Sequence, residues 1–207
     1  MIFKMYIYLI RHGESFEPAI EHYDTAKGTI NPPLTDMGLR QADRLALRCK
    51  DIGFDAVISS DLTRAVQTAE KIAVAVSCEL SVNSAFREID MGDIYTKSWT
   101  DFPDIYAQWA LHNEDIPYPN GENGEAVWSR CRGEIEKIVT AGYDRIAIVC
   151  HGGTIRSVIC GVLGIPQQKR FFFGAPLENC SVSIVRYKNE YKMFYLHSFN
   201  DCSHLCG

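Results

Sequence analysis

Apolar residues along this chain occur either in short continuous runs or in longer stretches where they recur every three to four positions. The short runs predict buried strands over 5–10, 56–59, 80–82 and 145–150. The longer stretches predict helices over 35–49, 61–76, 123–141 and 154–163. Thr35 is the expected N-cap of the first of these helices, and Ser60 or Asp61 that of the second. Two further strands, over 180–187 and 191–197, are expected to pair as a hairpin.

The alternation of strands and helices predicts the fold class. Such βα units form a mostly parallel central sheet with helices on both faces, an α/β three-layer sandwich. The segment 91–125 breaks the pattern because it is irregular and rich in aromatic residues. We expect it to contain one helix, near 101–112, and to form an inserted lid over the sheet edge. The whole chain, 1–207, is expected to be a single domain with this insertion.

Composition and charge narrow the class of protein. Hydrophobic residues make up 46% of the 207 positions and charged residues 23%, which is typical of a globular protein. The formal net charge of −5 argues against nonspecific binding to nucleic acid. No apolar run approaches the roughly 20 residues of a membrane helix, and the apolar N-terminus is interpreted as a strand rather than a signal peptide. We therefore expect neither nucleic acid nor membrane as a partner.

Eight cysteines are scattered singly through the predicted elements, without any Cys-x-x-Cys pair. This pattern favours reduced, mostly buried thiols in a cytoplasmic protein. Cys202 and Cys206 form the one close pair, and metal binding there is a minor alternative.

Polar turns follow three of the predicted strands at the ends where they stop. These turns are Arg11-His12-Gly13, Ser59-Ser60-Asp61 and His151-Gly152-Gly153. In parallel sheets, ligands bind beyond the carboxyl ends of the strands. The three turns are therefore expected to meet at one rim and to form a single site.

The residue types in these turns favour a phosphate ligand. Arg11 and Arg64 carry guanidinium groups that match phosphate oxygens, and Arg64 lies in the first turn of its helix, where the helix dipole is positive. Gly13 and Gly152 allow the backbone to approach a ligand closely. Two arginines and helix N-termini together make a strong site for a tetrahedral dianion.

The histidines and a carboxylate point to chemistry beyond binding. A neutral imidazole, from His12 or His151, can attack phosphorus and form a phosphohistidine. The leaving alkoxide then needs a proton, and Glu88 in FREIDMGD is the candidate donor, with Asp90 and Asp93 as rivals.

Five motifs in order resemble those of the histidine phosphatase superfamily, the phosphoglycerate mutase-like proteins. They are LIRHGES, PPLTDMGLRQA, ISSDLTRAVQTAE, REIDMGD and VCHGGTIRSV. The C-terminal FNDCSHL also resembles the ending of small bacterial phosphatases of this group.

The resemblance implies a role for each residue. His12 would be the phosphorylated nucleophile, Arg11 and Arg64 would hold the phosphoryl group, His151 would donate a hydrogen bond to it, and Glu88 would be general acid and then general base. No metal or organic cofactor is implied. Family members often carry Trp-Asn shortly after Arg-His-Gly, whereas this chain has Phe16-Glu17 there. The asparagine contact is either absent in this chain or supplied from elsewhere, with Ser15 as one candidate.

The function expected from these features is that of a phosphomonoester hydrolase acting on a small phosphorylated metabolite, such as a sugar phosphate or α-ribazole phosphate. A phosphoglycerate mutase is the first alternative, and a non-catalytic binder of phosphorylated ligands is the second. The aromatic residues of 91–125 are expected to pack in the core, with a substrate-lining role as the alternative. The sequence leaves the oligomeric state open, a homodimer included.

Overall fold

A mixed six-stranded sheet forms the centre of the computed structural model, which describes residues 4–18, 20–174 and 176–206. The strand order is β5-β4-β6-β1-β7-β8. The bounds of the sheet strands are β1 Lys4–Arg11, β4 Ala56–Ser59, β5 Leu80–Val82, β6 Arg145–Cys150, β7 Val182–Lys188 and β8 Met193–Asp201. Strands β5, β4, β6 and β1 run parallel, and β7 and β8 add an antiparallel edge. The predicted α/β class with a mostly parallel sheet is confirmed.

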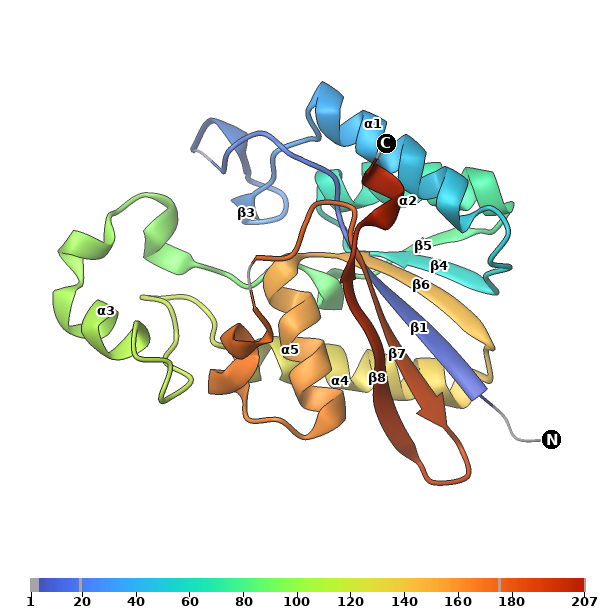
Figure 1. Ribbon diagram of the computed structural model, residues 1–207. Coiled ribbons are helices and arrows are strands. Elements are labelled where there is room, and N and C mark those ends of the chain that lie inside the picture. The colour runs from blue at the N-terminus through green and yellow to red at the C-terminus, as the bar shows by residue number, and fades with distance from the viewer. Residues whose placement is uncertain (1–3, 19, 175, 207) are drawn as a thin grey trace.

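Helices cover both faces of this sheet (Figure 1). The α-helices span α1 Asp36–Cys49, α2 Thr63–Val76, α3 Pro103–Trp109, α4 Gly124–Ala141 and α5 Gly152–Leu163. In Figure 1, α1 and α2 lie above the sheet, and α4 and α5 lie below it. Short 3₁₀ helices connect these elements, at η1 Ile20–His22, η2 Ser84–Phe86, η3 Gly92–Tyr95, η4 Trp99–Asp101, η5 Gln167–Phe173 and η6 Ser203–Leu205.

The alternation of side chains along the central strands divides the core into two layers. Ile7 and Leu9 of β1 lie in the core layer between the sheet and helices α4 and α5, whereas Ile10 lies in the layer between the sheet and helices α1 and α2. In β6, Ile148 faces the first layer and Val149 the second. Because successive side chains of a strand point to opposite faces, a continuous apolar run is needed wherever both faces are covered. This explains why β1 and β6 carry no charged residue between their exposed first residues, Lys4 and Arg145, and the rim.

The helix ends agree with the predictions in part. Thr35 caps α1 by accepting a hydrogen bond from the Gly38 N–H, as predicted. The predicted cap of α2 is wrong, because the N-cap is Leu62 and no side chain caps that helix. The Ser60 hydroxyl accepts the Leu62 N–H before the helix begins. Helix α5 starts at Gly152, two residues before the predicted start. Gly152 and Gly153 therefore belong to the helix and not to a turn before it.

Two regions differ in detail from the expectations. The segment between β1 and α1, which matched neither pattern in the sequence, contains a small antiparallel pair, β2 Tyr23–Asp24 and β3 Thr29–Ile30. The helix expected near 101–112 is α3, flanked by η3 and η4, and in Figure 1 this region projects beyond the strand ends as a separate lobe. The last strand continues to Asp201, and η6 after it returns to α1. The final hairpin itself is confirmed.

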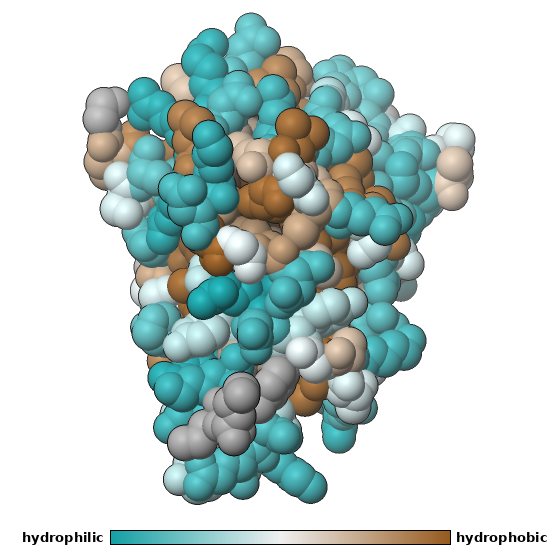
Figure 2. All heavy atoms as spheres, turned by 90° about the vertical axis from the view of Figure 1, so that its right-hand side faces the viewer, coloured by the Kyte–Doolittle hydropathy of each residue, from teal (hydrophilic) through white to brown (hydrophobic). Residues whose placement is uncertain are grey.

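The face opposite this lobe, where β1 begins, is shown in Figure 2. Hydrophilic side chains form most of its surface, and apolar ones appear between them. None of the helices in the described part of the chain has both the length and the apolar character that crossing a bilayer requires.

Candidate active site

The carboxyl ends of β1, β4 and β6 bring the three predicted polar turns to one rim of the sheet. Arg11 is the last residue of β1, and His12 follows it. Ser59 ends β4, and the first turn of α2 then carries Arg64. His151 follows β6 and is the N-cap residue of α5. The rings of His12 and His151 lie 5.0 Å apart between centroids, so residues 139 positions apart in the chain meet here.

Two hydrogen bonds define the tautomer of His12. Its Nδ1 lies 2.7 Å from the carbonyl oxygen of Gly13, and this oxygen can only accept, so Nδ1 carries the proton. Its Nε2 accepts a hydrogen bond from Arg64 Nε at 3.1 Å. The lone pair of Nε2 therefore lies on the side of the ring that faces the arginine.

The surroundings of His12 keep the imidazole neutral. The side chain is buried, and burial, followed by the charges of Arg64 and Arg11, lowers its pKa well below 6.5. A neutral imidazole with an unprotonated Nε2 is the form that can attack an electrophile.

The two arginines present buried donors to the same space. Arg11 Nη1 donates to the Leu177 carbonyl, and this bond holds the guanidinium in place. Arg11 Nε and Arg64 Nη1 are buried and have no hydrogen-bond partner in the described part of the chain. Because a buried unsatisfied donor is costly, such atoms are typical of a site that receives its partner from a ligand. An oxyanion suits both donors.

His151 is fully buried beside His12. Its Nε2 lies 2.9 Å from the Ser60 hydroxyl, and its Nδ1 is buried without a partner among the described residues. Burial, with the positive charges of Arg64 and other neighbours, lowers its pKa well below 6.5. His151 is therefore neutral near pH 7 and can donate only one N–H.

Glu88 reaches the site from the loop after η2 and lies against the N-terminus of α5. Its Oε1 accepts the N–H groups of Ile89 at 2.8 Å and Thr154 at 3.1 Å, and its Oε2 accepts the Gly153 N–H at 3.3 Å. A Cβ on Gly153 would lie 2.6 Å from Oε1, so a larger residue there would force the carboxylate to move. The surroundings of the carboxylate are thus a helix N-terminus and backbone donors.

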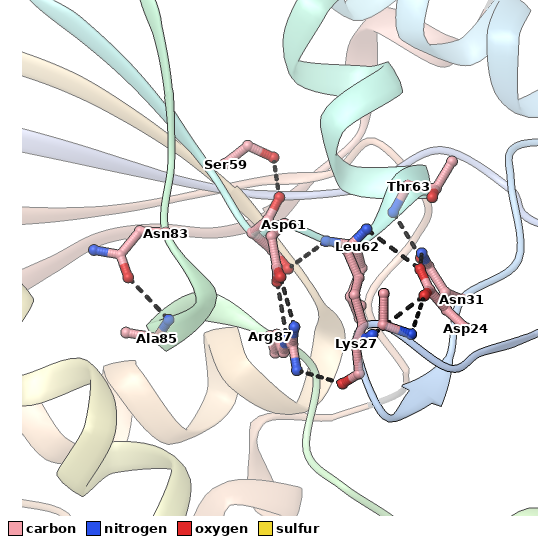
Figure 3. Close-up of polar contacts among 12 residues, drawn as sticks. Asp24, Lys27, Asn31, Ser59, Asp61, Leu62, Thr63, Asn83, Ala85 and Arg87 are labelled. Carbon is pink, nitrogen blue, oxygen red and sulfur yellow. Dashed lines mark hydrogen bonds and ion pairs between the residues drawn. The ribbon is translucent and has the colours of Figure 1, made fainter.

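The residue before Glu88 anchors this loop to two other segments (Figure 3). Arg87 forms a two-pronged ion pair with Asp61 at 2.6 and 2.8 Å, and it donates to the Lys27 carbonyl. Asn31 accepts the Thr63 N–H and thereby connects the β3 region to the start of α2. The bond network in Figure 3 places the Glu88 loop relative to the helix that carries Arg64.

The loop that carries His12 packs against α1 and α2. The Gly13 N–H donates to the Thr68 hydroxyl, which in turn donates to the Arg64 carbonyl. A Cβ on Gly13 would lie 2.6 Å from the Gly38 oxygen, so the loop packs directly on the start of α1. Gly13 therefore serves close packing of the backbone, and it does not line the cavity described next.

A cavity of about 580 Å³ opens over these groups, and this is within the range of small-molecule sites. Six of the predicted site residues line it, namely Arg11, His12, Ser15, Arg64, Glu88 and Gly152, whereas His151 does not. Ser15 also forms a bridge to Leu34. Asp90 and Asp93, the rivals of Glu88, do not line it, and Asp93 pairs with Lys97.

Several lining residues lay outside the sequence predictions. Asn179 lines the cavity and donates to the His12 carbonyl at 3.2 Å. Arg156, Arg170 and Phe171 come from α5 and η5. No local pattern marks these residues, because their position depends on how η5 folds back against α5. Thr68 could have been identified from the sequence, since it lies one helical turn after Arg64 in the same motif.

The aromatic residues of the 91–125 segment divide between packing and lining. Tyr106 and Trp109 each pack against Trp99, with ring centroids 5.3 and 5.2 Å from that of Trp99. Tyr95 and Tyr118 line the cavity. All eight cysteines are free thiols, and the described residues contain no group of three or more histidine, cysteine or acidic side chains arranged to hold a metal ion.

Comparison with known proteins shows what this arrangement resembles. The chain is 31% identical to the probable phosphoglycerate mutase GpmB of Proteus mirabilis, over 96% of this chain and 94% of that protein. A mycobacterial glucosyl-3-phosphoglycerate phosphatase has the same fold, with a TM-score of 0.81 at 21% identity, and covers 95% of this chain and 99% of its own. A mutant phosphoserine phosphatase of Entamoeba histolytica in complex with phosphoserine superposes with a TM-score of 0.79 at 25% identity, over 97% and 99%. The family model of the histidine phosphatase superfamily (branch 1) matches residues 7–201, and the chain belongs to this family.

Proposed function

We propose that this protein is a phosphomonoester hydrolase that works through a phosphohistidine on His12. One observation carries the proposal: the unprotonated Nε2 of His12 lies within 3.1 Å of Arg64, beside two buried guanidinium donors that have no partner among the described residues. A phosphoryl group bound between these groups would satisfy the donors and bring phosphorus next to the nucleophile.

In the first half of the reaction, His12 Nε2 attacks phosphorus and the bond from phosphorus to the ester oxygen breaks. Arg11 and Arg64 stabilise the charge on the oxygens that do not react. Glu88, in its protonated form, gives a proton to the leaving oxygen, which departs as an alcohol. His151, whose ring lies 5.0 Å from that of His12, is the candidate to offer one N–H to the same group.

In the second half, water attacks phosphorus and the bond from phosphorus to Nε2 breaks. Glu88 accepts the proton of the water, for which its two oxygens are held by the backbone donors of α5. The products are inorganic phosphate and the free imidazole. The sum of both halves is hydrolysis of one ester bond by one water, and no metal ion or organic cofactor takes part.

A phosphoglycerate mutase is the alternative function, and the relative from Proteus mirabilis bears that name. A mutase shares the first half, but its phosphohistidine is transferred to a second hydroxyl group instead of to water. Turnover of 3-phosphoglycerate primed with bisphosphoglycerate, compared with phosphate release from the same compound, separates the two activities. We expect phosphate release to dominate.

The proposal is tested by trapping the intermediate. Enzyme is mixed with a ³²P-labelled ester and quenched in alkali, in which phosphohistidine survives. Wild-type protein is expected to retain label, and His12→Ala to retain none and to release phosphate at least about 10³-fold more slowly. His197→Ala, the same change at an exposed histidine of β8, is the control and should behave as wild type. Label on the His12→Ala protein would refute the role of His12.

We also propose that the 91–125 segment is a lid on the single domain formed by residues 1–207. Its residues Met91, Tyr95 and Tyr118 form part of the cavity wall, which supports this role. The eight free thiols favour a reducing compartment, and we propose the cytoplasm.

A further inference from the structure

The part of the cavity farther from His12 has mostly apolar walls. Met91, Tyr95 and Tyr118 of the 91–125 segment contribute one wall, together with Phe171 of η5. Phe16 lines the cavity from the loop after β1, and 49% of its surface is exposed. Burial raises the pKa of Tyr118 to about 12 and also raises that of Tyr95, so both hydroxyl groups stay neutral. These walls suit a flat apolar group.

The two arginines in this part of the cavity are engaged in holding the fold. Arg170 forms an ion pair with Asp115, donates to the Gln167 carbonyl and stacks on the Phe171 ring at 4.5 Å. Arg156 donates to the carbonyls of Arg170 and Gly174. Both side chains are buried, and their N–H groups hold η5 against α5. Because Asp115 already balances the charge of Arg170, a ligand carboxylate would gain little from that guanidinium.

The charges near the cavity mouth are negative. Glu14 and Glu17 line the cavity and are exposed. Glu17 forms no ion pair in the described part of the chain, and Glu14 accepts only the Thr35 hydroxyl. An anionic group carried by the alcohol part of a substrate would therefore be repelled by two exposed carboxylates of the cavity wall.

From these three observations we infer that the substrate is a phosphate monoester of an uncharged alcohol that bears an aromatic or other flat apolar group. Esters with a second anionic group on the alcohol are excluded by the carboxylates at the mouth. The inference rests on the proposed function for the phosphoryl end of the cavity. It adds the chemistry of the alcohol part of the substrate, which the proposed function does not specify.

Binding of phosphonates tests this inference without turnover, because their carbon–phosphorus bond is not hydrolysed. Dissociation constants are measured by calorimetry for methylphosphonate, benzylphosphonate, and benzylphosphonates with a 4-carbamoyl or a 4-carboxylate group. We expect benzylphosphonate to bind at least about tenfold more tightly than methylphosphonate. The carboxylate compound should bind at least about tenfold more weakly than the carbamoyl compound, which has the same size and no charge.

Two charge-neutralising variants show where the discrimination arises. Glu17→Gln should reduce the ratio of the dissociation constants of the carboxylate and carbamoyl compounds by about threefold or more. Glu190→Gln removes one negative charge from the turn between β7 and β8, at the end of the sheet opposite the site, and should leave this ratio unchanged. A carboxylate compound that binds as tightly as its carbamoyl counterpart to the wild type would overturn the inference. So would equal affinities for benzylphosphonate and methylphosphonate.

The two proposals fail in different ways. If His12 takes no label but the phosphonates bind in the expected order, the hydrolase proposal falls and the ligand class stands. If His12 takes label but the carboxylate compound binds best, the hydrolase proposal stands and the ligand class falls. Failure of all four phosphonates to bind would overturn the phosphoryl site, and the ligand class with it.

Discussion

At the scale of the residue, the site depends on side chains whose neighbours determine their chemical form. In the proposed reaction, His12 attacks as the tautomer that the Gly13 carbonyl selects and in the neutral form that burial and two arginines maintain. Glu88 accepts hydrogen bonds from backbone donors of α5, and a Cβ at residue 153 would displace it from this position. A substitution next to a reacting group can therefore act as strongly as a substitution of the group itself.

Gly153→Ala is expected to displace the Glu88 carboxylate, because the new Cβ would lie 2.6 Å from Oε1. Turnover of an alkyl phosphate should fall by about 10-fold or more, toward the roughly 10²–10⁴-fold loss expected for Glu88→Gln. An aryl ester with a good leaving group should be less affected, since it needs less help from an acid. Steady-state kinetics on both ester types measures the difference.

Gly133→Ala is the matched control for this change. Gly133 lies in the interior of α4, and a Cβ there would meet no atom within 4 Å. The control should leave turnover unchanged and raise the free energy of unfolding by about 0.5–1 kcal/mol, because alanine favours helix. Equal kinetics for Gly153→Ala and wild type would contradict the positioning of Glu88 by α5.

At the scale of the element, one carboxylate joins the 91–125 segment to the body of the protein. Asp115 accepts the N–H groups of Gly124 and Glu125 at the start of α4, and it forms an ion pair with Arg170 of η5. The side chains of this pair are 13% and 3% exposed. Asp115 thus holds together three elements that line or support the cavity, and a carboxylate near a helix N-terminus is favourable.

Asp115→Ala should lower the free energy of unfolding by about 3 kcal/mol, because it leaves the buried Arg170 guanidinium without its counter-ion. Urea denaturation measures this loss. Asp93→Ala removes a carboxylate from the same segment, where its partner Lys97 is half exposed, and should cost no more than about 1 kcal/mol. Similar losses for the two variants would show that the Asp115 ion pair does not hold these elements together.

At the scale of the whole molecule, the site places two neutral histidines inside a folded protein. Burial and neighbouring positive charges hold the pKa of both His12 and His151 well below 6.5. In the unfolded chain both side chains titrate near 6.5. Between the folded and unfolded pKa values, the unfolded state binds more protons, so protonation favours unfolding in that range.

Stability is therefore expected to fall as the pH drops below about 6.5, by up to about 1.4 kcal/mol per pH unit for each histidine. Above that pH the two histidines contribute no slope, because they are neutral in both states. Urea denaturation at pH 8, 7, 6 and 5 measures the effect, and His12→Gln should reduce the slope below pH 6.5. A free energy of unfolding that stays constant or rises between pH 6.5 and 5 would contradict the buried, neutral state.

The sequence by itself determined the class of the fold and grouped the residues of the proposed phosphoryl site. A strand that is buried on one face alternates apolar and polar residues, so continuous apolar runs require a sheet covered on both faces, and the order of the elements then brings the ends of β1, β4 and β6 to one rim. Arg11, His12 and His151 lie at those ends or directly after them, and Arg64 lies in the first turn of the helix after β4, so local position was enough to group them. The tertiary structure alone decided the rest of the cavity. Phe171, Arg170 and Tyr118 come from irregular segments whose places follow from long-range packing, and no local periodicity encodes such packing.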